Sequence, residues 1–169
     1  MTIRRGRYKR RGRFRSNFER LVADQFIDAG AEWKYEIRKY QYETTSRRPI
    51  RCFNCGNDKG AVIREYLPDF FLSNGVVIEA KGRLLPADCS KLKAVRKQHP
   101  TLDLRILFQS DRKFSRTSEK RYSDFAREAG IPYAVGQVPE EWLVNSDQKF
   151  PRSAAAMERL FDGNSEENP

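Results

Sequence analysis

Two acidic residues and a lysine share one short apolar segment, residues 67 to 81, and their types could support metal-dependent cleavage of a phosphodiester. Asp69 precedes an Asn-Gly pair, and Glu79 and Lys81 follow it. Two opposed carboxylates repel each other unless a proton or a cation lies between them, and a hard divalent cation such as Mg²⁺ or Mn²⁺ prefers oxygen ligands. This layout is typical of a metal-dependent nuclease site.

The chemistry depends on the register of the hairpin that the Asn-Gly pair predicts. A three-residue loop with Gly75 in the left-handed conformation sets Asp69 opposite Glu79, and the two-residue period of a strand places Glu79 and Lys81 on one face. A two-residue loop would set Phe70 opposite Glu79 and separate the carboxylates. The simpler alternative is an ordinary hairpin whose charged residues face water. The apolar flanks predict instead that both faces are covered, and buried acids need a partner or a metal.

The length of 169 residues suits one domain with a sizeable core, and the net charge of +10 predicts a polyanionic partner. Nucleic acid is the first candidate, because Lys and Arg that neutralise phosphates release condensed counterions. An anionic membrane is a weaker candidate, since no strongly amphipathic basic helix is evident. No apolar run approaches a membrane span and no secretory signal is recognisable, so we expect a soluble, intracellular protein.

Residues 1 to 15 form a basic arm without any acidic residue. Like charges repel and little can be buried, so we expect disorder until the arm meets phosphates, with Tyr8 and Phe14 stacking on bases. The alternative is a solubilising or targeting tail. A second basic surface, which includes Lys91, is expected on a helix that is preceded by Pro86 and Asp88 and runs to about Gln98. The predicted DNA-binding residues are Arg4, Arg5, Arg7, Lys9, Arg10, Arg11, Arg13, Arg15, Lys93, Arg96 and Lys97.

Three cysteines, an odd number, argue against a closed set of disulfides and fit a reducing compartment. Cys52 and Cys55 form a C-x-x-C turn of the kind that supplies half of a structural zinc site. Completion would need Cys89 with His99, or the same pair from a second subunit. Two unligated thiols in a loop are the equally open alternative.

Apolar periodicity and turn residues predict an α/β order of elements. A capping-box sequence at Ser16 opens the first helix, and its apolar stripe is Phe18, Leu21, Val22, Phe26 and Ala29. The expected elements are a helix over 17 to 29, a strand over 33 to 42, the hairpin, a helix to about 98, a strand over 102 to 108, a helix over 119 to 129 and a strand over 131 to 135. Residues 43 to 60 lose periodicity, as in an inserted loop. We expect a mixed central sheet flanked by helices within residues 16 to 143, and a peripheral tail over 144 to 169.

Asp69 and Glu79-Ala80-Lys81, behind a helix bearing Glu19, resemble the PD-(D/E)xK nuclease superfamily, whose restriction-endonuclease-like core is an α/β fold. The chain further resembles endonuclease I of the T-odd bacteriophages, a family of Holliday-junction resolvases, in order over about residues 13 to 143. The matching motifs are Phe14-Arg15-Ser16, Pro68-Asp69-Phe70, Asn74-Gly75, Glu79-x-Lys81-Gly82, Gln98-His99-Pro100, Leu102-Asp103 and Pro139-x-x-Trp142.

The resemblance implies a role for each matching position. Asp69 and Glu79 would hold Mg²⁺ with the carbonyl of Ala80, Glu19 would reach a second metal, and Lys81 would stand beside the attacking water. By spacing alone, Glu19 would only cap its own helix. The family forms an intertwined homodimer through a bridge upstream of the Pro-Asp strand, and residues 43 to 60 are longer than that bridge. A phage-encoded protein of this kind would act in the host cytoplasm.

The resemblance therefore implies a metal-dependent endodeoxyribonuclease that resolves four-way and branched DNA junctions as a homodimer. A general or restriction-like endonuclease would use the same site but prefer linear duplex or a defined sequence. A non-catalytic DNA-binding protein would keep the basic surface and lose the acids, and all four candidate residues are present here.

Overall fold

The computed structural model describes residues 14–45 and 60–144. Its centre is a five-stranded sheet in the order β1-β4-β5-β6-β7. The strands are β1 (Trp33–Tyr35), β4 (Phe70–Leu72), β5 (Val77–Lys81), β6 (Leu104–Phe108) and β7 (Tyr133–Val135). The first three pair antiparallel and the last three parallel, which confirms the predicted mixed sheet. Within the described ranges no helix is both long and apolar enough to cross a bilayer.

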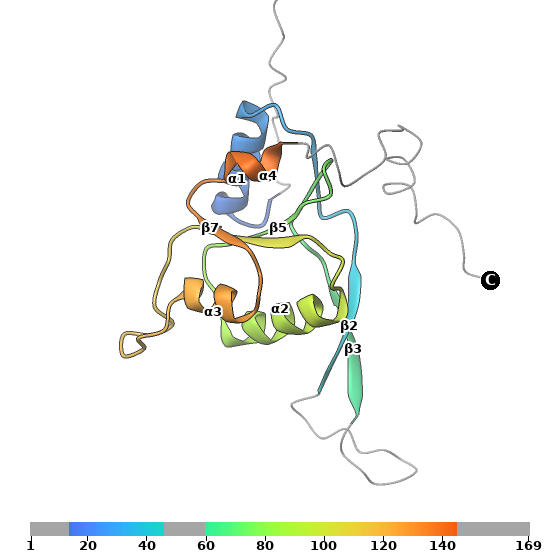
Figure 1. Ribbon diagram of the computed structural model, residues 1–169, viewed down its shortest axis with the longest axis vertical. Helices are drawn as coiled ribbons and strands as arrows, with labels where there is room; N and C mark the ends of the chain where they lie inside the picture. Colours follow the sequence, from blue (N-terminus) through green and yellow to red (C-terminus); the bar gives the residue numbers. More distant parts are fainter. Residues whose placement is uncertain (1–13, 46–59, 145–169) are drawn as a thin grey trace, which may run out of the picture.

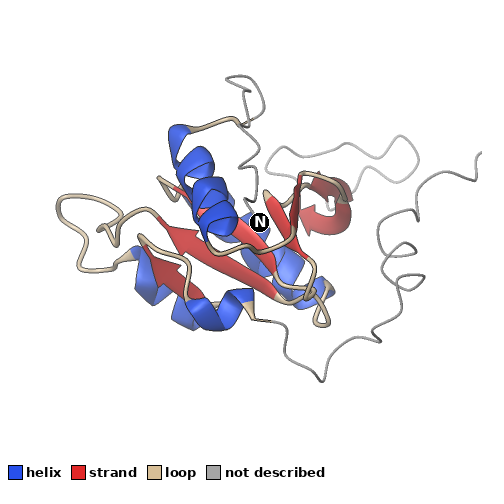
Figure 2. Ribbon diagram, turned by 90° about the horizontal axis from the view of Figure 1, so that it is seen from above, coloured by secondary structure: helices blue, strands red, loops and turns tan. Residues whose placement is uncertain are grey.

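Helices cover both faces of this sheet (Figure 1). The helices are α1 (Asn17–Asp28), α2 (Pro86–Gln98), α3 (Tyr122–Glu128) and α4 (Glu140–Leu143). One core, which includes Phe18 and Trp142, lies between the sheet and α1 with α4, and the other, which includes Leu92 and Phe125, lies between the sheet and α2 with α3. The two helical layers and the sheet between them are also visible from above (Figure 2).

The first helix begins and ends where its sequence predicts. The Ser16 hydroxyl accepts a hydrogen bond from the Glu19 N–H at 3.1 Å, and the chain leaves the helix through Gly30 at φ +67°. Phe18, Val22 and Phe26 of the predicted stripe are buried. The prediction was wrong for Leu21, which lies at the border of the stripe, and for Ala29, which is the C-cap residue after the last helical residue, Asp28; both are exposed.

The hairpin has the predicted three-residue register. Phe71 pairs with Val77, the Gly75 N–H donates to the Leu72 carbonyl, and Gly75 has φ +86°. The two-residue loop is therefore excluded. The Asn74 side chain also donates to the Trp142 carbonyl at 2.9 Å, so the turn is tied to the distant Pro139-x-x-Trp142 segment.

The expected single strand over residues 33 to 42 was wrong. Glu36 has φ +50°, a left-handed conformation that ends β1, and a new strand, β2 (Tyr40–Thr45), begins after it. β2 pairs antiparallel with β3 (Ala61–Tyr66), a strand that the sequence analysis missed, in a separate two-stranded sheet (Figure 1, Figure 2). The expected loop over 43 to 60 is thus shortened at its start. The residues between the two strands, 46–59, lie outside the described ranges.

The second half of the chain follows the prediction more closely. α2 ends at Gln98 and β6 ends at Phe108, as expected, and Leu92 and Val95 are buried. α2 already includes Pro86 and Asp88, which were expected to precede it, and β6 begins at Leu104 rather than at residue 102. α3 begins at Tyr122, later than expected, because residues 109 to 121 form a loop whose bridge between Lys113 and Arg121 precedes the helix. α4 was not predicted, since four residues carry no periodic signal.

Candidate active site

Asp69 and Glu79 face the α2 side of the sheet. Their strand neighbours Phe71 and Val77, two residues away along each strand, belong to the core beneath α2, so the two-residue period puts both carboxylates on that face. Both acids are buried, with 8% and 2% of their surface exposed. The hairpin therefore brings the predicted pair together in a setting where neither charge is fully hydrated.

Glu79 is held by two side chains. Tyr66 donates its hydroxyl hydrogen bond to Glu79 Oε2 at 2.7 Å, and the Lys81 ammonium lies 2.7 Å from Oε1. Burial and the negative charge of Glu79 raise the pKa of Tyr66 well above its usual range, so this phenol stays a donor. Tyr66, in β3, is a site residue that the sequence analysis missed.

Asp69 carries an unusually high pKa. Its Oδ2 accepts the Ala80 N–H at 2.8 Å, yet burial and the nearby charge of Glu79 raise its pKa from 3.8 to about 8. Two carboxylates in one apolar site cannot both ionise at low cost. A proton or a cation at this position would remove the repulsion.

The Lys81 side chain is an ammonium in this setting. Burial alone would lower its pKa, but the carboxylates of Glu79 and Asp88 outweigh burial and raise it above the usual value. Asp88 Oδ1 lies 3.6 Å from the Lys81 nitrogen. A protonated lysine donates hydrogen bonds and does not take a proton, so it can orient a water molecule or a phosphate oxygen but cannot serve as a base in this state.

Glu19 approaches the pair from α1. It is buried, accepts the Tyr35 hydroxyl at 2.6 Å and the Arg15 N–H at 2.9 Å, and lies close enough to contribute to the raised pKa of Asp69. The Ser16 hydroxyl donates to its other oxygen at 2.8 Å. Capping and proximity to the acidic pair thus coincide in one residue.

The donor set fits a hard divalent cation. Asp69 and Glu79 supply buried carboxylate oxygens. The Lys81 carbonyl accepts a hydrogen bond from Gln109 on the β6 side, and the main-chain groups of successive strand residues alternate in direction, so the Ala80 carbonyl points to the other side, where Ala80 donates to Asp69. In residues 14–45 and 60–144 no three His, Cys, Asp or Glu side chains form a cluster that could hold a metal by themselves. A cation would take its other ligands from the carbonyl, water or substrate.

The end of the predicted basic arm belongs to the folded domain. Phe14 packs edge-to-face on Tyr35 with ring centroids 4.9 Å apart, and the Arg15 guanidinium lies 2.8 Å from Glu36. The expectation that Phe14 stacks on bases was therefore wrong, because the aromatic core around Phe70 takes this ring. The residues from Arg4 to Arg13 lie outside the described ranges.

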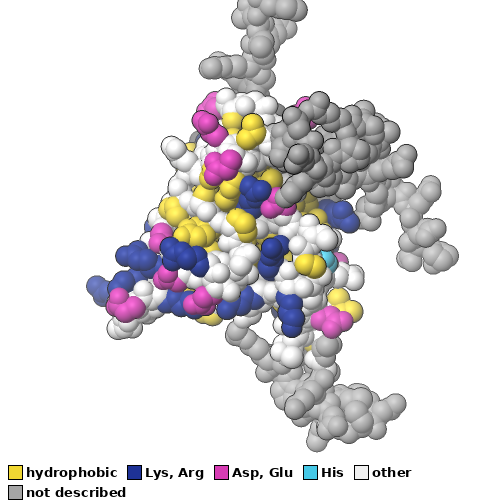
Figure 3. Space-filling model, in the orientation of Figure 1, with side chains coloured by type: hydrophobic (Ala, Val, Ile, Leu, Met, Phe, Trp, Pro, Cys, Tyr) yellow, Lys and Arg dark blue, Asp and Glu magenta, His cyan; other side chains and the backbone are white. Residues whose placement is uncertain are grey.

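The basic surface of α2 divides into three kinds of residue. Lys93 and Lys97 are exposed, as predicted for phosphate contacts. Arg96 instead donates to the Pro100 and Leu102 carbonyls beyond the helix end. Lys91 points to the acidic pair. Basic side chains, mingled with acidic ones, gather over the lower half of the face in Figure 3, where α2 and α3 lie.

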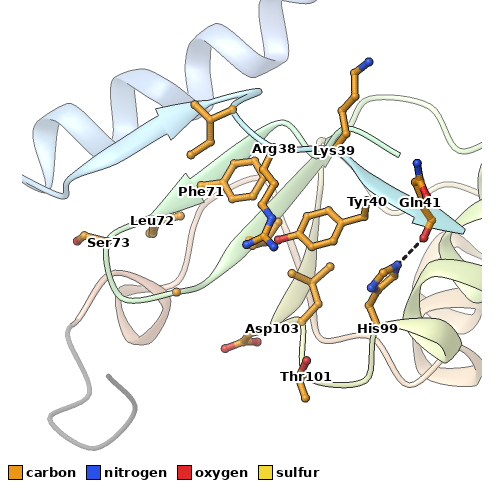
Figure 4. A pocket seen from close by; sticks show the side chains of 14 residues that line it. Arg38, Lys39, Tyr40, Gln41, Phe71, Leu72, Ser73, His99, Thr101 and Asp103 are labelled. Atoms are coloured by element: carbon orange, nitrogen blue, oxygen red, sulfur yellow. Dashed lines mark hydrogen bonds between the residues drawn. The ribbon is translucent and has the colours of Figure 1, made fainter. Parts of the chain in front are cut away.

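The structure excludes one of the two zinc arrangements. Cys89 and His99 are separated by ten residues of one helix and its cap, a distance of about 15 Å, so they cannot share an ion. The His99 ring instead lies 2.7 Å from the Gln41 carbonyl at one side of a cavity of about 650 Å³ (Figure 4). Cys52 and Cys55 lie outside the described ranges.

A mixed α/β domain with two buried carboxylates and an ammonium on one hairpin has the features of a phosphodiester-cleaving enzyme. The family model for phage endonuclease I matches residues 1–159. The chain is 33% identical to Endonuclease I of Escherichia phage T7 over 141 residues, 83% of this chain and 85% of that protein. It is 32% identical to Endodeoxyribonuclease 1 of Enterobacteria phage T3 over 139 residues, 82% of each chain. The chain belongs to the phage endonuclease I family and is a nuclease, which confirms the resemblance seen in the sequence.

Proposed function

We propose that this protein is a structure-selective DNA endonuclease that resolves four-way (Holliday) and other branched junctions by metal-dependent hydrolysis. The observation that carries the proposal is the buried pair Asp69 and Glu79 beside the Lys81 ammonium, in a chain of the endonuclease I family. The name of the T3 relative specifies deoxyribonucleic acid as its substrate. The net charge of +10 suits binding to a polyanion.

The proposed chemistry assigns a task to each residue. Asp69, Glu79 and the Ala80 carbonyl would bind Mg²⁺ or Mn²⁺, with Glu19 available for a second ion, and bound metal ions lower the pKa of water and offset charge on the phosphate. Lys81 donates a hydrogen bond to the attacking water and holds it in line. The water oxygen bonds to phosphorus as the bond from phosphorus to the 3′ oxygen breaks; the water loses a proton to the solvent and the 3′ oxygen takes one up, which leaves a 5′ phosphate and a 3′ hydroxyl.

We further propose that the protein acts as a homodimer. Two active sites in one particle suit paired nicks across a four-way junction, where shape and phosphate contacts dominate recognition. The β2–β3 sheet is separate from the central sheet and lies just upstream of the Pro-Asp strand, where the bridge between the two chains would fall. Sedimentation of the purified protein tests this, and a monomer at the concentrations that cleave junctions would refute it.

Cleavage of an immobile four-way junction with Mg²⁺ or with EDTA tests the enzymatic proposal. Asp69→Asn, Glu79→Gln and Lys81→Ala should each abolish turnover while junction binding persists, because phosphate contacts supply most of the affinity. Lys113→Ala, which removes one exposed charge from the loop between β6 and α3, is the matched control and should cleave normally. Wild-type turnover by any of the three site variants would show that the site is wrongly assigned.

The same assay separates junction resolution from general cleavage. We expect the four-way junction to be cut faster than its component linear duplexes of identical sequence. Equal rates on both would favour a general endonuclease, and cleavage confined to one sequence would favour a restriction-like enzyme.

A further inference from the structure

A second lysine, Lys91 of α2, faces the same carboxylate as Lys81. Its nitrogen lies 3.8 Å from Glu79 Oε1 and 3.5 Å from Asp88 Oδ1. The corresponding distances for Lys81 are 2.7 Å and 3.6 Å. Two ammonium groups therefore converge on one oxygen of Glu79 and one oxygen of Asp88.

Lys91 is held more loosely than Lys81. Both of its carboxylate distances exceed the usual 2.7–3.2 Å of a direct hydrogen bond, so its N–H groups are better placed than those of Lys81 to turn to another acceptor. Its side chain is 26% exposed, against 18% for Lys81. The ammonium is thus beside the acidic pair and still accessible from solvent.

Neighbouring groups keep Lys91 beside Glu79. Its nitrogen lies 5.3 Å from the centre of the Tyr66 ring, within the range of a cation–π contact, and the hydroxyl of the same ring donates to Glu79. At the start of α2, Asp88 Oδ2 accepts a hydrogen bond from the Leu85 N–H at 3.1 Å. This bond orients the carboxylate so that its other oxygen, Oδ1, faces both lysines. Burial alone would raise the pKa of Asp88, but Lys81 and the Leu85 N–H lower it below its usual value.

The placement does not follow from stability alone. An ion pair between Lys91 and Asp88, three residues apart on one helix, needs no approach to the hairpin, and such pairs contribute little on a surface. Here the ammonium is turned instead toward a 2%-exposed acid that belongs to the active site. A cation at this point has an evident ligand in the anionic substrate.

We propose that Lys91 is a second catalytic lysine, which binds a non-bridging oxygen of the phosphate being cut, and that Asp88 is a positioning residue that holds Lys91 and Lys81 beside Glu79. The inference rests on the proposed function and extends it to residues outside the PD-(D/E)xK motif. When DNA enters, the Lys91 ammonium exchanges its long contacts with the carboxylates for a direct hydrogen bond to the phosphate. Its charge then opposes the negative charge that grows on the phosphate oxygens as water attacks.

Single-turnover cleavage of the junction by the full-length protein tests the proposal. Lys91→Ala should lower the maximal rate by about hundredfold to thousandfold, as removal of one transition-state donor does elsewhere. Its junction affinity, measured in Ca²⁺ without cleavage, should change by less than about threefold. Lys91→Arg, which keeps the charge, should restore part of the rate. Lys91→Met keeps the stem over Tyr66 and replaces the alanine variant if that variant does not fold.

A substrate with sulfur at the cleaved phosphate tests the contact itself. Sulfur can replace either of the two non-bridging oxygens, which gives two stereoisomers of the substrate. The native protein should cleave one of them more slowly, the one in which sulfur replaces the oxygen that Lys91 binds, and this decrease in rate should be smaller in the Lys91 variant. Asp88→Asn keeps an acceptor for the Leu85 N–H but removes the charge. Asp88→Asn should lower the cleavage rate less than Lys91→Ala does. The decrease in rate of the double variant should be smaller than the product of the two single decreases.

Three results would overturn the inference. A normal maximal rate in Lys91→Ala shows that Lys91 is not catalytic. A normal maximal rate with weaker binding and a salt slope reduced by about one shows that it contacts a different phosphate. An unchanged sulfur effect in the variant shows that it does not touch the cleaved phosphate. Asp69→Asn is measured in the same experiment to separate this inference from the proposed function. If Asp69→Asn is inactive, the three results above refute only the role of Lys91; if Asp69→Asn is fully active, the proposed function itself is refuted. Lys113→Ala is the charge-matched control.

Discussion

Replacement of Asp69 by Asn should make the metal-free protein more stable at neutral pH. The pKa of Asp69 is raised from 3.8 to about 8 by burial and by Glu79, so between these values the folded protein binds one proton that the unfolded chain has lost. The stability that protonated Asp69 contributes is complete below pH 3.8 and is lost as the pH rises toward 8. Asn cannot ionise, and its side-chain oxygen can still accept the Ala80 N–H.

The magnitude follows from the shift. Each pH unit within this window changes the free energy of unfolding by about 1.4 kcal/mol per proton, so from about pH 5 to about pH 7.5 the native protein should lose roughly 3 kcal/mol that Asp69→Asn keeps. For a protein of this size the melting temperatures should diverge by roughly 6–12 °C over that range.

Urea or thermal unfolding in EDTA across this pH range measures the difference. Asp24→Asn, which changes an exposed acid of α1, is the matched control and should run parallel to the native protein. Glu79→Gln should also weaken the pH dependence, because it removes the charge that helps to raise the pKa of Asp69. Parallel stability curves for the native protein and Asp69→Asn would refute the reasoning.

The same experiment gives a readout of metal binding that does not depend on activity. A cation that binds Asp69 and Glu79 only in the folded state should raise the melting temperature of the native protein at about pH 7.5. The increase should be absent in Asp69→Asn. An equal increase in both proteins would place the metal elsewhere.

Three further predictions concern other parts of the chain. Deletion of residues 2 to 12 should weaken junction binding and flatten its dependence on salt, since phosphate contacts would be lost; an unchanged slope in a salt series would mean that this segment does not bind DNA. If Cys52 and Cys55 form a Cys₄ site across a dimer, metal analysis should find one zinc per dimer, and the double Cys→Ser variant should dissociate more readily; absence of zinc would refute the site. Gly75→Ala should cost about 1–2 kcal/mol in unfolding experiments because alanine is strained at φ +86°, and an unchanged stability would contradict the turn geometry.

The elements that depend on nearby residues were predictable from the sequence. The Asn-Gly pair between two apolar runs predicted the hairpin, and the three-residue loop among its two possible registers predicted the convergence of Asp69 and Glu79. The Ser16 cap and Gly30 determined the ends of α1. In each case the signal lies within a few residues of the feature, because turn geometry and strand or helix periodicity are local properties.

Other features were decided only by packing between distant segments. Tyr66 reaches Glu79 from a strand whose sequence has no clear alternation, and Lys91 reaches it because α2 crosses the face that carries Glu79. From the sequence, Lys91 was assigned to the same basic surface as Lys93. The sequence of the helix alone does not show which of these lysines faces the acidic hairpin. Phe14 likewise joined the aromatic core because the fold brings β1 beside it. Sequence therefore determined which residues could do the chemistry, whereas the tertiary structure decided which side chains surround them, since those contacts join residues far apart in the chain.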